Sequence, residues 1–119
     1  YDESLVIGDV KVGENTWIGP FTVLDGAGRI EIGDNCAISS GVHIYTHSSV
    51  GRIVSSGTEA TEYGAVKIGN SAYIGPNTVV TMGVTIGANA IVGANSLVMD
   101  DVPEGCKAYG TPCRVRETQ

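Results

Sequence analysis

The chain has 119 residues, enough for one domain over residues 1–119, and 42% of them are hydrophobic while 17% are charged, as in ordinary globular proteins. A formal net charge of -6 without a basic run argues against nucleic-acid binding, which needs clustered Lys and Arg. No apolar run approaches membrane-spanning length, so no membrane partner is expected. The sequence starts at Tyr1 and is already in its repeat by Ile7, which leaves open the loss of an N-terminal segment.

An aliphatic residue followed by glycine recurs along the chain in steps of six, and internal repeats of this kind predict the architecture directly. With the other aliphatic residues at the same spacing included, the anchors fall into three registers. These are positions 12, 18 and 24, then 32, 38 and 44, then 68, 74, 80, 86, 92 and 98.

The six-residue step predicts strands and excludes a helix. An even step keeps every anchor on one side of a strand, whereas on an α-helix it turns about 600° and scatters the anchors around the axis. The residue four after each anchor is usually small, which suits a tight corner. We therefore expect an all-β fold in which short strands form three-sided coils, stacked in parallel roughly 4.8 Å apart around a column of Ile, Val and Leu.

The first interruption of the repeat lies between Leu24 and Ile32, where eight residues replace six. It contains Asp25-Gly26-Ala27-Gly28, and its glycines predict a tight bulge at a corner. Trp17, the one tryptophan of the sequence, precedes this bulge at an outward position.

The second interruption is a long insertion between Ile44 and Ile68, which leaves a protruding loop at about residues 46–65. Loops longer than roughly 12 to 15 residues in a compact domain are usually functional. Both histidines of the sequence, His43 and His47, lie at the base of this loop.

After Val98 the pattern is expected to stop, which makes residues 99–119 a closing segment. Its Gly110-Thr111-Pro112-Cys113-Arg114 resembles the Gly-x-Pro-x-Lys/Arg element that ends the last coil in one family of enzymes. That family also has the Ile-Gly-Asp-Asn and Ile-Gly-Pro-Asn turns present here at residues 32–35 and 74–77.

These motifs resemble the hexapeptide-repeat acyltransferases, in particular those similar to maltose and galactoside O-acetyltransferases. The resemblance extends over nearly the whole chain and implies a left-handed parallel β-helix, whose hand the spacing alone does not dictate. It also implies a homotrimer with active sites between subunits, and acetyl-CoA as the co-substrate. The expected activity is acetyl transfer to a hydroxyl or amino group of a sugar, sugar nucleotide or similar small acceptor.

The segment Gly41-Val42-His43-Ile44-Tyr45-Thr46-His47 resembles the one that bears the family's catalytic histidine. His47 matches that position better than His43 because it follows the strand and opens the loop. Fewer residues separate the strand from the histidine here than in the family pattern. Acyl transfer from a thioester needs a base for the acceptor's proton, and imidazole suits neutral pH. His43 is expected to point outward, with a structural or subunit-contact role and catalysis as its alternative.

Several residues are candidates for binding the acceptor. Asp25 and Tyr45 each follow an anchor by one position, so they are expected at the same site of successive coils, where Asp25 could orient His47 or bind a hydroxyl. The alternative for Asp25 is a turn residue before glycine. Trp17 could stack on a sugar or lie at a subunit contact. The remaining candidates are the loop residues Glu59, Glu62 and Tyr63, for which solvated side chains are the alternative.

For the donor, the resemblance implies a coenzyme A groove along the last coils at Pro76, Ala94 and Met99. Small residues suit such close approach, which adds Thr81 and Gly83. Arg114 matches a basic position that meets the nucleotide phosphate, since a guanidinium fork suits that group. The family's second basic residue is replaced by Asp100, so Lys107 or Arg116 would have to substitute for it.

The three cysteines have no metal-like spacing and indicate a reduced, cytoplasmic setting. A γ-class carbonic anhydrase shares the predicted fold, but it needs three zinc-binding histidines and this chain has two, so no metal is expected. The non-catalytic alternative is a hexapeptide-repeat trimerisation module or scaffold, which leaves the long loop without a purpose. The sequence does not identify the acceptor, the acyl chain length, or the choice between O- and N-acetylation.

Overall fold

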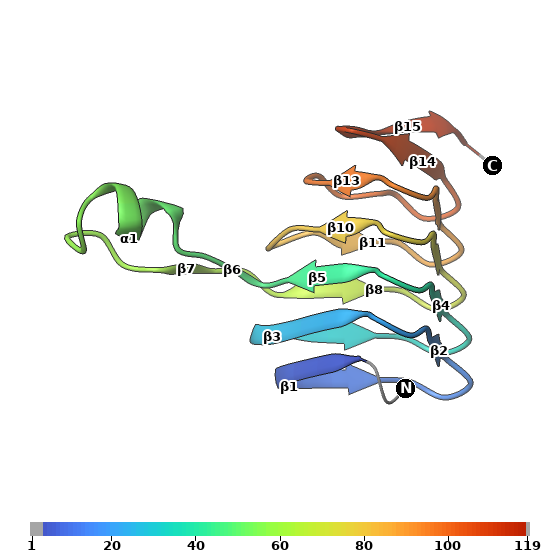
Figure 1. Cartoon of the computed structure of the whole chain (residues 1–119). Coiled ribbons are helices and arrows are strands. Elements are labelled where there is room, and N and C mark those ends of the chain that lie inside the picture. Colours follow the sequence, from blue (N-terminus) through green and yellow to red (C-terminus); the bar gives the residue numbers. More distant parts are fainter. Residues whose placement is uncertain (1–3, 119) are drawn as a thin grey trace.

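The computed structural model describes residues 4–118, so residues 1–3 and 119, at the ends of the predicted domain and closing segment, lie outside the described residues. The chain winds upward as a three-sided stack of coils, with the first coil at the bottom and the last at the top of Figure 1. The strands are β1 (Leu5–Val12), β2 (Trp17–Ile18), β3 (Val23–Ile32), β4 (Ala37–Ile38), β5 (His43–Tyr45), β6 (His47–Ser48), β7 (Glu62–Tyr63), β8 (Val66–Ile68), β9 (Tyr73–Ile74), β10 (Val79–Val80), β11 (Thr85–Ile86), β12 (Ile91–Val92), β13 (Leu97–Val98), β14 (Lys107–Gly110) and β15 (Cys113–Glu117).

Two parallel sheets form the three sides. The first sheet has the order β11-β8-β3-β5-β10-β13, with β1 added on β3, and the long strands β1 and β3 bend around a corner to serve two sides. We call the side with β5, β10 and β13 the first side, and the side with β8 and β11 the second side. The second sheet, β15-β14-β12-β9-β4-β2, forms the third side and ends in the antiparallel pair β14/β15.

The anchors stack in register, as the six-residue spacing predicts. Leu24 pairs with Ile44, Ile44 with Val80, and Val80 with Val98, and each of these side chains is at most 1% exposed. The small residues of the second inward position line the same core, among them Thr78 and Ala90, both 0% exposed. Burying an aliphatic side chain fully contributes about 1.5 to 3 kcal/mol, so this column is the main source of stability.

The predicted bulge after Leu24 is confirmed, and it lies inside a continuous strand. Gly8 pairs with Gly26, and the next pair is Val10 with Ile30. Between these two pairs β3 advances by four residues while β1 advances by two. The two extra residues of β3 carry the chain outward at the corner between the first and second sides.

The six-residue spacing stops after Val98, but one further turn of the helix follows it. Val102 forms a parallel bridge with Ile86, and Ala108 pairs in parallel with Val92. The residues of each pair are 16 positions apart in the sequence, two fewer than in a full 18-residue coil. Val102 and Ala108 are both buried. The shortened coil breaks the six-residue spacing and so conceals its inward positions in the sequence.

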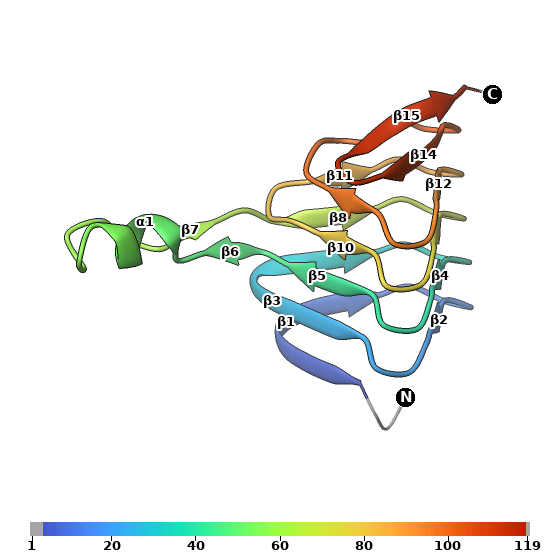
Figure 2. The same ribbon diagram turned by 45° about the horizontal axis from the view of Figure 1, so that its top comes forward.

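The long insertion forms an arm, which we define as residues 47–63. It consists of the antiparallel pair β6/β7 and the short helix α1 (Val50–Val54) between them. Figures 1 and 2 show it extending far from the stacked coils, with α1 near its tip. The arm's Val50, Ile53 and Val54 are 69–77% exposed. No helix within residues 4–118 combines the length and apolarity needed to cross a membrane.

Candidate active site

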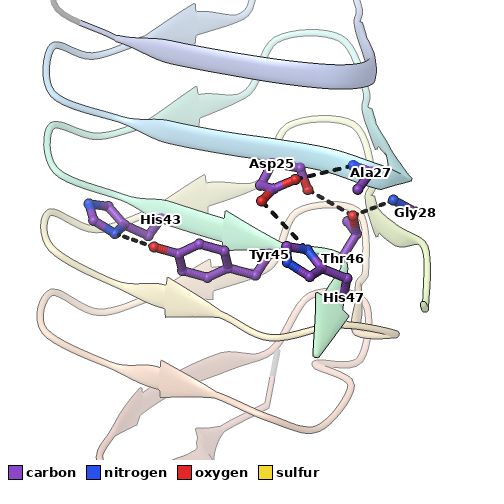
Figure 3. Close-up of polar contacts among 7 residues, drawn as sticks. All are labelled: Asp25, Ala27, Gly28, His43, Tyr45, Thr46 and His47. Carbon is purple, nitrogen blue, oxygen red and sulfur yellow. Dashed lines mark hydrogen bonds and ion pairs between the residues drawn. The ribbon is translucent and has the colours of Figure 1, made fainter. Parts of the chain in front are cut away.

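His47 and Asp25 meet at the corner where the arm leaves the coils. Asp25 pairs in register with Tyr45 on the neighbouring strand, which confirms that these two residues occupy the same site of successive coils. Two residues later, the Nδ1 atom of His47 faces Oδ2 of Asp25 at 3.5 Å, as the close-up in Figure 3 shows. The imidazole and the carboxylate have exposed fractions of 32% and 14%, so the pair is partly shielded from water.

The arrangement leaves one imidazole nitrogen facing an acid. The other carboxylate oxygen of Asp25, Oδ1, accepts a hydrogen bond from the backbone N–H of Ala27 at 3.3 Å, which ties the side chain to its own bulge. His47 Nδ1 is buried and makes no hydrogen bond to any residue of 4–118, so Asp25 is the polar group toward which it points. A small closing movement would convert this contact into a charge-assisted hydrogen bond.

A groove of about 410 Å³ opens beside His47. It combines the expected base with Tyr45, an expected acceptor residue, and with Thr81 and Met99, two expected donor residues. The groove is lined by Tyr45, His47, Ser48, Thr81, Met82 and Met99, so its polar groups are the imidazole and three hydroxyls, and the rest of its wall is apolar.

His43 lies on the far side of Tyr45 from His47, as Figure 3 shows. Its Nδ1 atom is 3.0 Å from the Tyr45 hydroxyl, and the two rings meet edge to face with centroids 5.9 Å apart. Both residues are half-buried. His43 therefore contacts the groove only through Tyr45, and it is not among the residues that line the cavity.

The arm brings one of its three candidate residues close to His47. Tyr63 pairs with His47 across the β6/β7 ribbon, with ring centroids 6.3 Å apart, and Glu62 pairs with the groove residue Ser48. Glu59 lies instead at the far end of the arm, where its carboxylate approaches Gly51 of α1. Trp17 is 51% exposed on the third side and does not line the groove.

The expected donor residues of the last coils divide between two corners. Thr81 and Met99 lie at the arm corner, and Gly83 donates a backbone hydrogen bond of 3.0 Å to Gly64, where the chain returns from the arm. Pro76 and Ala94 lie one above the other at the corner between the third and first sides, where Asn95 donates to the carbonyl of Pro76 at 2.9 Å. The first side of the helix separates these two groups.

Arg114 lies in the closing hairpin, at a second cavity of about 180 Å³. Its Nη1 atom is 3.9 Å from Oδ2 of Asp100, the acid that stands where a basic residue was expected. Both side chains are more than half exposed, so this pair is weak and an anion could replace the carboxylate. Lys107 pairs with Glu117 at 3.8 Å outside this cavity.

Cys113 also lines the second cavity, and burial raises the pKa of its thiol, although a hydrogen bond from Ser96 and the nearby Arg116 and Arg114 oppose this effect. A raised pKa keeps the thiol protonated at neutral pH, where it is a poor nucleophile. In the part of the chain that the structure describes, no three His, Cys, Asp or Glu side chains come together as a metal site would require.

Sequence reasoning missed three residues of this site. Ser48 and Met82 line the groove, and each directly follows a residue that was proposed, His47 and Thr81. Thr46 is fully buried beside the base and the acid, and its hydroxyl contacts the backbone carbonyl of Asp25 and the backbone N–H of Gly28. Its sequence position, two residues after the anchor Ile44, gives no sign of this role.

Comparison with known families matches two parts of the chain. Residues 60–100 match the bacterial transferase hexapeptide family (six repeats), and residues 9–46 match the hexapeptide repeat of succinyl-transferase. Nodulation protein L of Rhizobium meliloti (strain 1021) is 40% identical over 110 residues, which are 91% of this chain and 59% of that protein. The chain thus spans less than two thirds of that relative's length.

Solved structures give the same result over almost all of the chain. A hexapeptide-repeat acetyltransferase from Vibrio cholerae is 34% identical with a TM-score of 0.85, over 98% of this chain and 70% of its own, and it has also been solved with acetyl-CoA. A maltose O-acetyltransferase from Clostridium difficile 630 is 32% identical with a TM-score of 0.79, over 97% of this chain and 66% of its own. The fold predicted from the repeat is confirmed, and the chain belongs to the hexapeptide-repeat acyltransferases with a left-handed parallel β-helix.

Proposed function

We propose that this protein transfers an acetyl group from acetyl-CoA directly to a hydroxyl or amino group of a sugar, sugar nucleotide or similar small acceptor. The observation that carries the proposal is the groove that combines His47 with Tyr45, Thr81 and Met99. A base, an acceptor wall and donor residues are thereby within reach of one reacting centre. The acetyl-CoA complex of the Vibrio cholerae relative and the activity named for the maltose O-acetyltransferase support the same class of reaction.

In the proposed reaction His47 is the general base, and Asp25 holds its orientation. A proton on Nδ1 directed at Oδ2 of Asp25 leaves the Nε2 lone pair free to accept the acceptor's proton. The acceptor oxygen or nitrogen then bonds to the thioester carbonyl carbon, and the carbon–sulfur bond breaks. The departing sulfur takes the proton from Nε2, which returns the imidazole to its starting state. No acyl-enzyme forms, and the protonated thiol of Cys113 is consistent with such direct transfer.

For the acceptor we infer contacts with Tyr45 and Tyr63, which flank His47 on the coil and on the arm. An aromatic ring offers a flat apolar surface to the carbon face of a sugar, while its hydroxyl group serves polar contacts. His43 holds the Tyr45 ring through the 3.0 Å contact with its hydroxyl, which is a positioning role. Glu62, Glu59 and Trp17 remain candidates for parts of the acceptor, or for a subunit contact, outside the groove.

For the donor we infer that the acetyl-bearing end of acetyl-CoA lies against Thr81, Gly83 and Met99, and that Arg114 binds a phosphate of the nucleotide end. Arg114 has a weakly held partner in Asp100, so an incoming phosphate would have to displace that carboxylate. Pro76, Ala94 and Lys107 are secondary candidates along the outer edge of the coils.

We further infer a homotrimer with its active sites between subunits, in the cytoplasm. The groove is open toward the outside of the coils, and the arm's apolar residues Val50, Ile53 and Val54 are exposed. Both features suit an adjoining copy of the chain. The free, buried thiols of Cys36, Cys106 and Cys113 suit a reducing compartment.

The proposal is tested by screening the purified protein with acetyl-CoA against amino sugars, neutral sugars, sugar nucleotides and aminoglycosides, with release of free thiol as the readout. We expect acceptor-dependent thiol release with at least one class, at a rate that the His47→Ala variant lowers by about 10² to 10⁴. Failure of acetyl-CoA to bind, measured by calorimetry, would contradict the proposal and favour a non-catalytic scaffold.

A further inference from the structure

Thr46 lies beside the pair of Asp25 and His47, and its hydroxyl bridges Asp25 and Gly28 of the bulge. The side chain is 0% exposed. Its Oγ1 donates a hydrogen bond to the backbone carbonyl of Asp25 at 2.7 Å and accepts one from the backbone N–H of Gly28, also at 2.7 Å. Figure 3 shows both contacts beside the pair of Asp25 and His47.

The backbone of Thr46 also ties the arm to the coils. Its carbonyl accepts a 2.9 Å hydrogen bond from Gly64, at the return of the arm, and Gly64 in turn accepts from Gly83 on the next coil at 3.0 Å. Gly28 packs so closely that a Cβ atom there would lie 2.5 Å from the Thr46 carbonyl oxygen. The Asp25 bulge and both ends of the arm therefore meet at this one residue.

We propose that Thr46 is a positioning residue that sets the Asp25 carboxylate against the His47 imidazole; as a statement about catalysis this rests on the function proposed above. Strand pairing places the backbone of Asp25 against Ile7 and Tyr45 but leaves residues 27–29 of the bulge unpaired, and Ala27 among them donates the hydrogen bond that orients the Asp25 carboxylate. The Thr46 hydroxyl joins the carbonyl of Asp25 to the N–H of Gly28 inside the bulge, and so it holds the segment that orients the carboxylate; the peptide bond from Thr46 leads directly to His47. The Thr46 side chain thus positions both Asp25 and His47.

A matched control exists on the same chain. Thr16 also donates to a carbonyl, that of Gly33 at 2.6 Å, and accepts from an N–H three residues further on, that of Cys36 at 3.1 Å. Its corner contains no histidine and does not line the groove. Replacing either threonine by valine removes the same pair of hydrogen bonds while keeping the side-chain volume.

The experiment compares Thr46→Val, Thr46→Ser and Thr16→Val with the wild type. We expect Thr46→Val to lower kcat on the order of 10-fold to 100-fold with little change in KM for acetyl-CoA, because small displacements of catalytic groups have effects of this size. Thr46→Ser keeps the hydroxyl and should recover most of the rate. Thr16→Val should lose comparable thermal stability but stay within about 3-fold of the wild-type rate, since its hydrogen bonds lie away from the reacting groups. Equal rates in the two valine variants would overturn the proposal.

A second readout does not depend on activity. The chain has two histidines, so the His47 ring resonances can be assigned by NMR through the His47→Ala variant. We expect Thr46→Val to move these resonances in the same direction as Asp25→Asn, and Thr16→Val to leave them in place. Unchanged resonances in Thr46→Val would contradict the positioning role even if no acceptor is found. If Thr46→Val does not fold, Thr46→Ala gives the same comparison.

Discussion

The two histidines differ in what their Nδ1 atoms face, and this difference separates their expected roles. His47 points at the carboxylate of Asp25 and lines the groove, whereas His43 contacts the Tyr45 hydroxyl and lies outside the groove. A base needs direct access to the acceptor's proton, and of the two histidines it is His47 that lines the groove. Their sequence separation of four residues gives no hint of this division.

We expect His47→Ala to keep the assembly and the acetyl-CoA affinity but to lower kcat by about 10² to 10⁴, the usual effect of removing a positioned base. His43→Ala is the control, with a much smaller loss of kcat. Steady-state kinetics with calorimetric binding of acetyl-CoA measures both quantities. The assignment would be wrong if His43→Ala were the more damaging change. Near-wild-type rates in both variants would rule out a histidine base.

At the scale of elements, the closing hairpin β14/β15 supplies a cationic group at the end of the helix. The shortened last coil places Asp100 beside Arg114, and both line the second cavity with Cys113. The other arginine of this hairpin, Arg116, lies over the ring of Tyr109 at 5.1 Å and does not line that cavity. One arginine of the hairpin thus lines the cavity, and the other packs on an aromatic ring.

We expect Arg114→Ala to raise KM for acetyl-CoA with a smaller change in kcat, because a phosphate contact far from the thioester contributes equally to ground state and transition state. Asp100→Asn should lower KM, since it removes a competing anion. Arg116→Ala serves as the matched control and should leave KM near the wild-type value. A collapse of kcat at unchanged KM in Arg114→Ala would exclude the phosphate contact.

At the scale of the whole molecule, the three sides differ in polarity. The outward column of the second side is polar, whereas those of the first and third sides are mainly apolar. The columns are Lys11, Glu31, Lys67 and Thr85 on the second side; Leu5, Val23, His43, Val79 and Leu97 on the first; and Trp17, Ala37, Tyr73, Ile91 and Lys107 on the third. A cyclic trimer buries two different faces of each subunit, so we expect it to use the first and third sides.

Phe21 marks the corner between these two sides. It has a φ of 60° and an exposed fraction of 63%, whereas the same corner in later coils has Gly41, Asn77 and Asn95, residues that tolerate this conformation. A bulky residue there is strained, and its ring is exposed to water in the isolated chain. Both costs would be offset if the ring were buried near the threefold axis of a trimer.

We therefore expect a trimer at micromolar concentration, measured by light scattering, that Phe21→Asn weakens. The direction of this change is informative, because asparagine relieves the backbone strain and should stabilise a chain that does not associate. The control is Lys67→Ala on the polar second side, which should leave the assembly unchanged. A well-folded wild-type monomer, or a Phe21→Asn variant that is more stable and equally associated, would contradict the arrangement.

The sequence by itself determined the coil. The six-residue period of Ile, Val and Leu keeps these side chains on one side of the strands, so the stacked coils, the core and the bulge after Leu24 followed from the spacing. The left hand of the helix came from the family resemblance instead. The same arithmetic correctly placed Asp25 beside Tyr45, because in-register stacking transfers a position on one coil to the next. The site residues remain expectations, since their matches to a family motif say nothing about side-chain direction.

Only the tertiary structure decided which groups meet at the arm corner. The contact of His47 with Asp25, the bridging hydroxyl of Thr46 and the pairing of Arg114 with Asp100 depend on side-chain rotamers and on how two irregular segments leave the coils. The inward residues of the last coil were not predicted for a related reason. With two residues fewer, it reaches the same inward positions through buried Val102 and Ala108, and only stacking on Ile86 and Val92 identifies them. A period is a local property of the chain, whereas these contacts are set by packing between coils.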